Sequence, residues 1–331
     1  MHKILPSKAM PSVPWQARHA DSDYGVSDEP DWRQVDWASH LHRVEVGQDS
    51  LTYVDLGEGE GNPVVFVHGL GGQWQNFIET LPRIAQERRV LALDLPGFGS
   101  SEMPAGGEIS IQEYGKVVDG FCEVLGLERV ALVGNSMGGF IAAEVTIQNP
   151  ERVERLVLIS AAGITSSNIL HAPTRLIGRV AKVVTAATTV SHHRRMSSRP
   201  VTRHVALALV ARHPCKLRAD AAWEGLIKGA GRDGFEAALM ASVKYDYRDR
   251  LEEIECPTLI IWGENDSVIS VEDAHEYERL ISDSRKTVME DTGHVPMMER
   301  PRAVNDVVLE FLAETGAAEE RETVDAASER R

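Results

Sequence analysis

One short stretch constrains the fold of this chain more than any other: residues 134–138, which read Gly-Asn-Ser-Met-Gly. An apolar run at residues 130–133 precedes it, and a segment with helical periodicity follows it. A buried strand that turns sharply into a helix needs glycines on both sides of the turn, because a side chain there would clash with the neighbouring strand or helix. The turn holds Ser136 at a strained backbone angle and lifts its hydroxyl above the sheet edge. We therefore predict that Ser136 is a nucleophile beside the free N–H groups of a helix start.

Continuous apolar runs recur along the chain, as expected for strands that are buried on both faces. Segments with helical periodicity separate them, and this alternation predicts a parallel sheet covered by helices. Two stretches of alternating polarity come first, as in an antiparallel hairpin. The predicted strands are residues 43–46, 51–54, 64–67, 90–93, 130–133, 156–159, 258–262 and 286–289, and the predicted helices lie near 75–86, 110–126, 138–149 and 301–314. The expected fold class is α/β, with a mostly parallel eight-stranded sheet flanked by helices.

The strand pattern divides the chain into a core, an insertion and two terminal segments. Residues 41–162 and 251–314 form the predicted core. Residues 163–250 interrupt the strands and are helical in composition, so we expect a helical cap over the carboxyl edge of the sheet, where open α/β sheets bind ligands. Residues 1–40 are rich in Pro, Asp and Ser and are expected to form an arm that docks through its tryptophans. Residues 315–331 lack an apolar stripe and are expected to form a flexible C-terminal tail.

Charge, cysteine content and missing motifs argue against several classes of function. The net charge of −15 over 331 residues argues against a general nucleic-acid binder. The three cysteines lie far apart and form no disulfide framework or metal pair, which favours a reducing, cytoplasmic location. The N-terminus lacks the apolar core of a signal peptide, and no stretch is long and uncharged enough to span a bilayer. Since no phosphate loop, dinucleotide fingerprint or zinc motif occurs, we predict neither a cofactor nor a metal.

A serine hydroxyl becomes a good nucleophile only when a base accepts its proton, and the base needs an orienting partner. Of the twelve histidines, His294 alone lies in a loop that follows a predicted core strand after the nucleophile. Asp266 lies just past the penultimate strand and is the predicted acid. Its competitors are Glu264, which is closer to the strand end, and Asp273, which falls in the following helix. The predicted catalytic residues are therefore Ser136, Asp266 and His294.

Acyl transfer also needs N–H donors for the oxyanion of the tetrahedral intermediate. The first predicted donor is the backbone N–H of Met137, the residue after the nucleophile. The second should come from the loop at residues 68–72, which reads His-Gly-Leu-Gly-Gly, and we assign it to Leu70. His68 precedes the nucleophile at a strand end, so a structural role is favoured over a catalytic one.

At this point the chain resembles the α/β-hydrolase superfamily over about residues 42–314. The matching segments are residues 68–72, 94–99, 134–139, 263–266 and 293–294. The chain order Ser, Asp, His is also that of the superfamily. The resemblance implies a cofactor-independent serine hydrolase, similar to carboxylesterases and lipases, that cleaves a small-molecule ester through an acyl-enzyme on Ser136.

Three other chemistries of the superfamily fit this sequence less well. Serine at position 136 argues against epoxide hydrolases and haloalkane dehalogenases, which use aspartate there. The string Gly-Asn-Ser-Met-Gly-Gly also resembles the meta-cleavage-product hydrolases, which break carbon–carbon bonds in dienoate diketones. Those enzymes tend to carry a His-Gly-Gly-Gly-Pro loop and a Trp after the catalytic His, whereas this chain has Leu70 and Val295. A non-catalytic, ligand-binding homologue is a further alternative, which the intact triad disfavours.

The insertion carries an unusual charge pattern for an acidic protein. Residues 164–219 contain no Asp or Glu but many basic residues. Residues 173–190 place apolar side chains on one helical face and Arg175, Arg179 and Lys182 on the other, which predicts a basic amphipathic helix. Its apolar face can pack on the core while the basic face meets water or the acidic body. Alternatively, the cap contacts anionic lipid or steers an acidic substrate.

Overall fold

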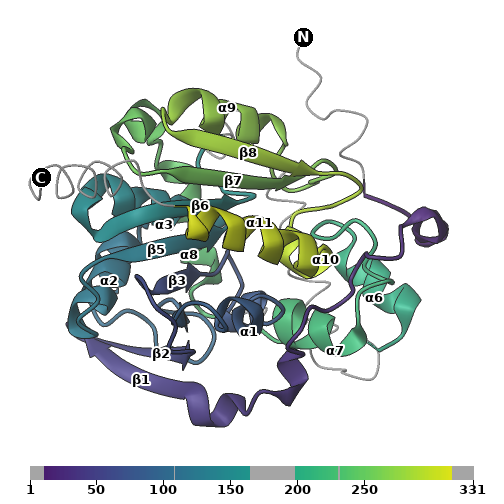
Figure 1. Ribbon diagram of the computed structural model, residues 1–331, viewed down its shortest axis with the longest axis horizontal. Coiled ribbons are helices and arrows are strands. Elements are labelled where there is room, and N and C mark those ends of the chain that lie inside the picture. Colours follow the sequence, from purple (N-terminus) through teal and green to yellow (C-terminus); the bar gives the residue numbers. More distant parts are fainter. Residues whose placement is uncertain (1–10, 108, 165–197, 230–231, 315–331) are drawn as a thin grey trace, which may run out of the picture.

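A single mixed sheet organises the molecule (Figure 1). The structure, a computed structural model, describes residues 11–107, 109–164, 198–229 and 232–314. Its strands are β1 (Leu41–Val46), β2 (Asp49–Leu56), β3 (Val64–Val67), β4 (Val90–Leu93), β5 (Val130–Asn135), β6 (Val153–Ile159), β7 (Thr258–Gly263) and β8 (Ser284–Met289). They form an 8-stranded sheet in the order β1-β2-β4-β3-β5-β6-β7-β8. Of the seven strand pairings, β1–β2 and β2–β4 are antiparallel and the other five are parallel, so the predicted mostly parallel sheet is confirmed.

Helices cover both faces of the sheet. The α-helices described are α1 (Leu81–Ile84), α2 (Ile111–Val124), α3 (Met137–Gln148), α6 (Pro200–Leu207), α7 (Ala219–Ala222), α8 (Phe235–Lys244), α9 (Glu272–Leu280), α10 (Pro296–Glu299) and α11 (Pro301–Ala313). Successive strand residues face opposite sides, so Val65 belongs to the core cluster that includes residues of α2, α3 and α9, while Phe66 belongs to the cluster that includes residues of α1 and α11. The two resulting cores hold the strand ends, and therefore the loops after them, in fixed positions.

One predicted helix is divided in two. The pattern at residues 75–86 predicts a continuous helix, but the chain forms a 3₁₀ turn at Trp74–Phe77 and then the short helix α1. Pro82 explains the break, because it has no N–H to bond back to the preceding turn and its ring disfavours a helix interior. At the second position of α1 the missing N–H costs nothing, since the first N–H groups of a helix have no partner within it.

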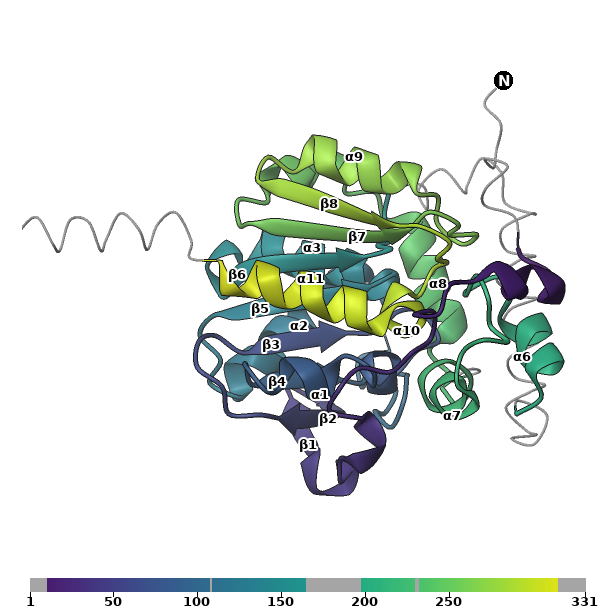
Figure 2. The same ribbon diagram turned by 45° about the vertical axis from the view of Figure 1, so that its right-hand side comes forward.

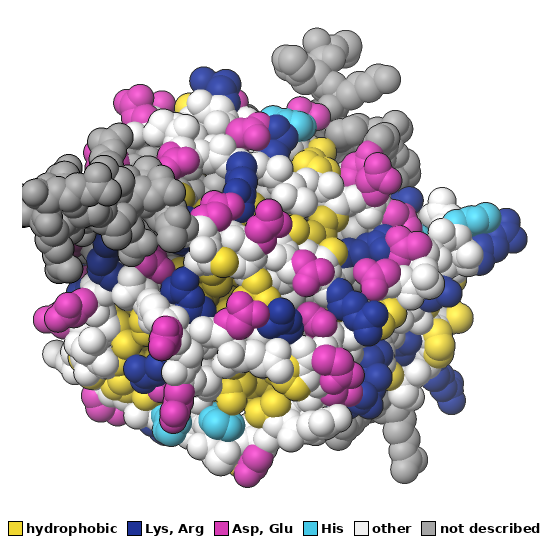
Figure 3. Space-filling model, in the orientation of Figure 1, with side chains coloured by type: hydrophobic (Ala, Val, Ile, Leu, Met, Phe, Trp, Pro, Cys, Tyr) yellow, Lys and Arg dark blue, Asp and Glu magenta, His cyan; other side chains and the backbone are white. Residues whose placement is uncertain are grey.

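The insertion follows β6 and precedes β7. Its described part contains α6, α7, a π-helix at Trp223–Ile227 and α8, and Figure 2 shows these helices beyond the carboxyl ends of the strands. Lys and Arg side chains gather over α6 and α7 on the right-hand side of Figure 3. The amphipathic helix predicted for residues 173–190 and the tail at residues 315–331 lie outside the described residues, and the division into domains stays a prediction. Within the described part of the chain, no helix is long and apolar enough to cross a membrane.

The N-terminal arm, residues 11–40, packs against the core through selected aromatic side chains. Tyr24 and Trp32 are buried, and the indole N–H of Trp32 donates a hydrogen bond to Glu79 at 3.0 Å. Trp37 is half-buried, and its ring centroid lies 4.9 Å from that of Trp74. Trp15, by contrast, is 67% exposed. Burial of Tyr24 brings this arm close to the loop that carries His294, as described below.

Candidate active site

Ser136 occupies a sharp turn between β5 and α3, with φ 57° and ψ −121°. A non-glycine residue rarely adopts a positive φ, and such strain is typical of functional positions. A Cβ atom on Gly134 would lie 2.2 Å from the Gly138 carbonyl oxygen, and one on Gly138 would lie 2.0 Å from that of Val67. Backbone atoms therefore leave no room for a side chain at either position. The start of α3 excludes one at Gly134, and the end of β3 excludes one at Gly138. The side chain of Ser136 is left half-buried at the carboxyl edge of the sheet.

The segments of both predicted oxyanion donors border this turn. Gly139 and Phe140 donate to the Ser136 carbonyl at 3.0 and 3.2 Å, so the N–H of Met137 comes before the first bond of the helix. Leu70 lies in a turn that closes with a 3.0 Å bond from Gly72 N–H to the Gly69 carbonyl. A Cβ on Gly69 would be 3.0 Å from Ser136 Cβ, so this loop passes directly beside the serine. The structure thus brings the segments of both predicted oxyanion donors to Ser136.

Asp266 and His294 are joined by a short hydrogen bond. His294 Nδ1 lies 2.7 Å from Asp266 Oδ2, and both side chains are buried. The other oxygen, Oδ1, accepts from the N–H groups of Val268 and Ile269 at 2.8 and 2.9 Å. Because a carboxylate only accepts hydrogen bonds, Nδ1 carries the proton and Nε2 is the nitrogen left to accept one. Asp266 is thus the acid that binds the histidine ring.

The loop of His294 lies against the residue before the serine. The side-chain amide of Asn135 donates to the carbonyl oxygens of Ile159 and His294, at 3.0 and 3.3 Å. Asn135 therefore ties β5, the end of β6 and the histidine loop together. The end of β7 approaches the same loop closely, since a Cβ on Gly263 would be 2.0 Å from the Gly293 carbonyl oxygen. These contacts bring three loops that are distant in sequence to one edge of the sheet.

Sequence reasoning missed two polar residues that support this loop. Asn135 occupies the variable position of the serine motif, where the pattern places no constraint. Glu299 is fully buried in α10 and accepts hydrogen bonds from the N–H groups of Gly293 and Val295. The one available signal for Glu299 was a single acid directly after the apolar residues 295–298, five positions beyond the histidine.

His68 and Asp94 hold the neighbouring loops. His68 is buried, its Nδ1 contacts the Gly69 carbonyl at 2.8 Å and its Nε2 accepts from the N–H of Leu95 at 3.0 Å. Burial lowers the pKa of His68 to about 4, so the ring is neutral at pH 7. Asp94 accepts from the N–H of Trp74 at 2.7 Å, and burial raises the pKa of its carboxyl to about 6. Both ring nitrogens of His68 are thus occupied by backbone partners in two adjacent loops.

Comparison with known proteins places the chain in a family. A family model described as alpha/beta hydrolase fold matches residues 62–301. The chain belongs to the α/β-hydrolase family. A relative from Pseudomonas putida, named 2-hydroxy-6-oxo-2,4-heptadienoate hydrolase, is 31% identical over 274 residues, which cover 77% of this chain and 90% of that protein.

Solved structures agree with this assignment. A bacterial membrane phospholipase A, described as a virulence factor, is similar to this α/β-hydrolase with a TM-score of 0.63 and 26% identity over 82% of this chain and 85% of the other. Est816, described as an N-acyl homoserine lactone degrading enzyme, matches with a TM-score of 0.60 and 23% identity over 82% of this chain and 100% of the other. At that identity the second similarity shows the fold alone.

Proposed function

We propose that this α/β-hydrolase cleaves carboxylic esters with a catalytic triad of Ser136, His294 and Asp266. One observation supports the proposal above all others. His294 forms a hydrogen bond of 2.7 Å with Asp266, and the backbone of His294 is in turn bonded to Asn135, the residue before the strained Ser136. A histidine so oriented can act as a general base at Nε2. The same three residue types in this chain order serve acyl transfer throughout this fold.

The proposed reaction proceeds in two stages. His294 Nε2 takes the proton of the Ser136 hydroxyl while Oγ attacks the ester carbonyl carbon, and the N–H groups of Met137 and Leu70 stabilise the oxyanion. The C–O bond to the alcohol then breaks, and His294 returns the proton to the leaving alkoxide. Water attacks the acyl-enzyme with His294 again as base, which releases the acid and restores the serine. Asp266 keeps the ring oriented and stabilises its charged form.

Apolar side chains beside the oxyanion loop favour an apolar acyl group. Leu70 and Phe235 are half-buried and pack on the same core cluster. The Phe235 ring of α8 lies against this loop, since a Cβ on Gly71 would be 3.1 Å from Phe235 Cε2. An aromatic and a leucine side chain at this position provide surface for a hydrocarbon chain and leave the ester carbonyl near the N–H donors.

A second candidate is hydrolysis of a carbon–carbon bond by the same residues. It is favoured by the relative from Pseudomonas putida, whose name specifies a 2-hydroxy-6-oxodienoate substrate. The test compares p-nitrophenyl esters of increasing acyl length with such a dienoate, for the wild type and for S136A. We expect ester hydrolysis that falls by a factor of roughly 10⁴ or more in S136A. A larger kcat/KM for the dienoate would replace the ester assignment, and full activity of S136A would exclude the triad.

Two further parts of the proposal concern the surroundings of the enzyme. The cysteines Cys122, Cys215 and Cys256 are all free thiols, which supports the cytoplasmic location. The basic surface over α6 and α7 supports contact with anionic lipid. Co-sedimentation with vesicles tests the second point: binding should be stronger to anionic than to neutral vesicles, and equal binding would exclude an electrostatic contact.

A further inference from the structure

The loop that carries His294 is attached to one buried carboxylate. Glu299 has no exposed surface. Its two oxygens accept from the N–H of Gly293 at 3.0 and 2.9 Å, and Oε1 also accepts from the N–H of Val295 at 3.3 Å. These two peptides flank His294 on either side. The position of the carboxylate therefore sets the position of the backbone that bears the proposed base.

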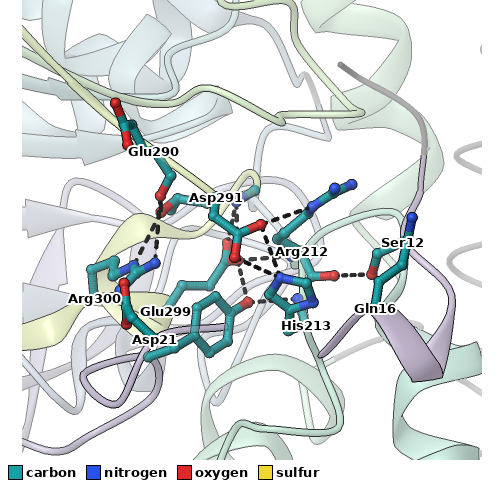
Figure 4. A network of polar contacts seen from close by, with 12 residues as sticks. Ser12, Gln16, Asp21, Arg212, His213, Glu290, Asp291, Glu299 and Arg300 are labelled. Atoms are coloured by element: carbon teal, nitrogen blue, oxygen red, sulfur yellow. Dashed lines mark hydrogen bonds and ion pairs between the residues drawn. The ribbon is translucent and has the colours of Figure 1, made fainter. Parts of the chain in front are cut away.

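The same carboxylate is held by two segments from outside the core, as Figure 4 shows. The N–H of Arg212, in the insertion, donates to Glu299 Oε2 at 2.7 Å. The hydroxyl of Tyr24, in the N-terminal arm, donates to the same oxygen and accepts from the N–H of His213 at 2.7 Å. The arm also bonds the backbone of Glu299, since the N–H of Gly25 donates to its carbonyl at 2.8 Å.

The insertion also bonds the histidine directly. The N–H of His294 donates to the Val210 carbonyl at 2.8 Å. Gly293 permits this approach, because a Cβ there would lie 2.8 Å from the N–H nitrogen of Arg212 and 3.0 Å from Glu299 Oε1. All three consecutive N–H groups at residues 293–295 thus have identified partners, and each partner is either Glu299 or the insertion. The loop has little freedom to move while these bonds are intact.

Charged side chains around Glu299 form ion pairs with one another. Asp291 accepts from Arg212 Nε at 3.2 Å and lies 2.8 Å from His213 Nε2. The Arg300 guanidinium lies 5.1 Å from the centre of the Tyr24 ring and forms an ion pair with Asp21 of the arm. Burial raises the pKa of the Glu299 carboxyl, and its hydrogen bonds from backbone N–H groups and from the tyrosine oppose that shift.

We propose that Glu299 and Tyr24 are positioning residues for His294, so that the N-terminal arm takes part in catalysis. The inference rests on the proposed function, in which His294 is the base. Neither residue contacts the reacting atoms. Both act through the backbone on either side of the histidine, and a displacement of about 1 Å at a catalytic group can cost roughly 100-fold in rate. Removal of the Tyr24 hydroxyl takes away the acceptor of the His213 N–H and one of the three donors to Glu299 Oε2.

The test uses the full chain with the variants Y24F and E299Q and two matched controls. Y24F removes one oxygen atom and keeps the ring, whereas E299Q places an amide group opposite N–H donors. The controls are Y114F and E144Q. In the wild type, the Tyr114 hydroxyl donates to the Pro96 carbonyl at 3.1 Å, and the fully buried Glu144 carboxylate accepts from the Tyr245 hydroxyl at 2.9 Å. Each control removes a buried polar contact of the same kind away from the histidine loop.

Three experiments are carried out on each folded variant. They give kcat and KM for a p-nitrophenyl ester, the rate of covalent labelling by a fluorophosphonate, and the downfield proton signal of the bond between His294 and Asp266. We expect Y24F and E299Q to lower kcat by about 10- to 100-fold with KM changed less than about twofold. Labelling should slow in parallel, and the downfield proton signal should shift or broaden. Y114F and E144Q should lower the melting temperature and keep kcat.

The outcomes separate this inference from the proposed function. Wild-type kcat in folded Y24F and E299Q would overturn the positioning role, as would an equal loss of kcat in the controls. The variant H294A provides the second comparison. If H294A is inactive while E299Q is fully active, only the positioning role fails. If H294A retains ester hydrolysis, the proposed function fails and the positioning role fails with it.

Discussion

The variant D266N tests the orientation of the proposed base, His294, and its effect can be worked out from the contacts of the aspartate. The N–H groups of Val268 and Ile269 require an acceptor at the position of Asp266 Oδ1. An asparagine therefore places its carbonyl oxygen there and its NH₂ group opposite His294 Nδ1. The flipped amide would leave two half-buried N–H groups unpaired, at up to about 1–3 kcal/mol each. The first orientation is thus favoured by a few kcal/mol.

That orientation forces the wrong tautomer of the histidine. An NH₂ donor opposite His294 Nδ1 binds the ring only when Nδ1 is unprotonated, so the proton moves to Nε2. Nε2 can then no longer accept the proton of Ser136. In serine proteases the same change lowers the rate roughly 10⁴-fold, which corresponds to about 5.5 kcal/mol of transition-state stabilisation. We expect a loss of that order in kcat for D266N, with the fold retained.

The assay measures kcat and KM on a p-nitrophenyl ester together with thermal unfolding. E264Q is the matched control, because Glu264 lies in the same turn and was the nearest competing acid in the sequence. E264Q should keep kcat within about threefold of the wild type, since it leaves the tautomer of His294 unchanged. A folded D266N with kcat within tenfold of the wild type would refute the reasoning. So would a loss in E264Q that equals the loss in D266N.

Two other variants test the structure around the proposed triad, and a third tests a buried acid elsewhere in the molecule. G138A should lower the free energy of unfolding by about 3 kcal/mol or more, measured in urea, because the new Cβ would lie 2.0 Å from the Val67 carbonyl oxygen; wild-type stability would contradict the turn. N135A should reduce kcat more than it changes KM, because the bond to the His294 carbonyl is lost, and an unchanged kcat would remove Asn135 from the support of the loop. E79Q tests a buried acid, since burial raises the pKa of Glu79 from 4.5 to about 7. An acid whose folded pKa is raised loses stability as pH rises from 4.5 to 7, so E79Q should gain up to about 3 kcal/mol relative to the wild type between pH 4 and pH 8. A stability difference that does not change with pH would contradict this.

The sheet and the position of the serine could be predicted from the sequence because local patterns determine them. Strands buried on both faces must be apolar, and the serine turn requires glycine on each side for steric reasons. The predicted strand ends were less accurate where charged residues enter the core. The pattern starts one strand at residue 156, yet β6 starts at Val153. Arg155 is buried within it, and its guanidinium lies 5.2 Å from the centre of the Phe311 ring, a contact that the local sequence does not reveal.

The supports of the histidine loop could not be predicted, because their partners are distant in sequence. Glu299 contacts Tyr24, 275 positions away, and Arg212, 87 positions away. A lone glutamate in a short helical stretch is usually exposed, so its burial follows only from the folded arrangement. Which tryptophans of the arm are buried could not be predicted either. Trp32 is buried and Trp15 is 67% exposed, although both lie in polar, proline-containing segments.

Active-site labelling tests the central claim most directly. The wild-type protein is treated with a fluorophosphonate, the bound label is counted by intact mass, and its position is found by peptide mapping. We predict one label per chain, attached to Ser136, with loss of ester hydrolysis in proportion to labelling and no label in S136A. A protein that hydrolyses esters without being labelled, or that carries the label on another residue, would contradict the account.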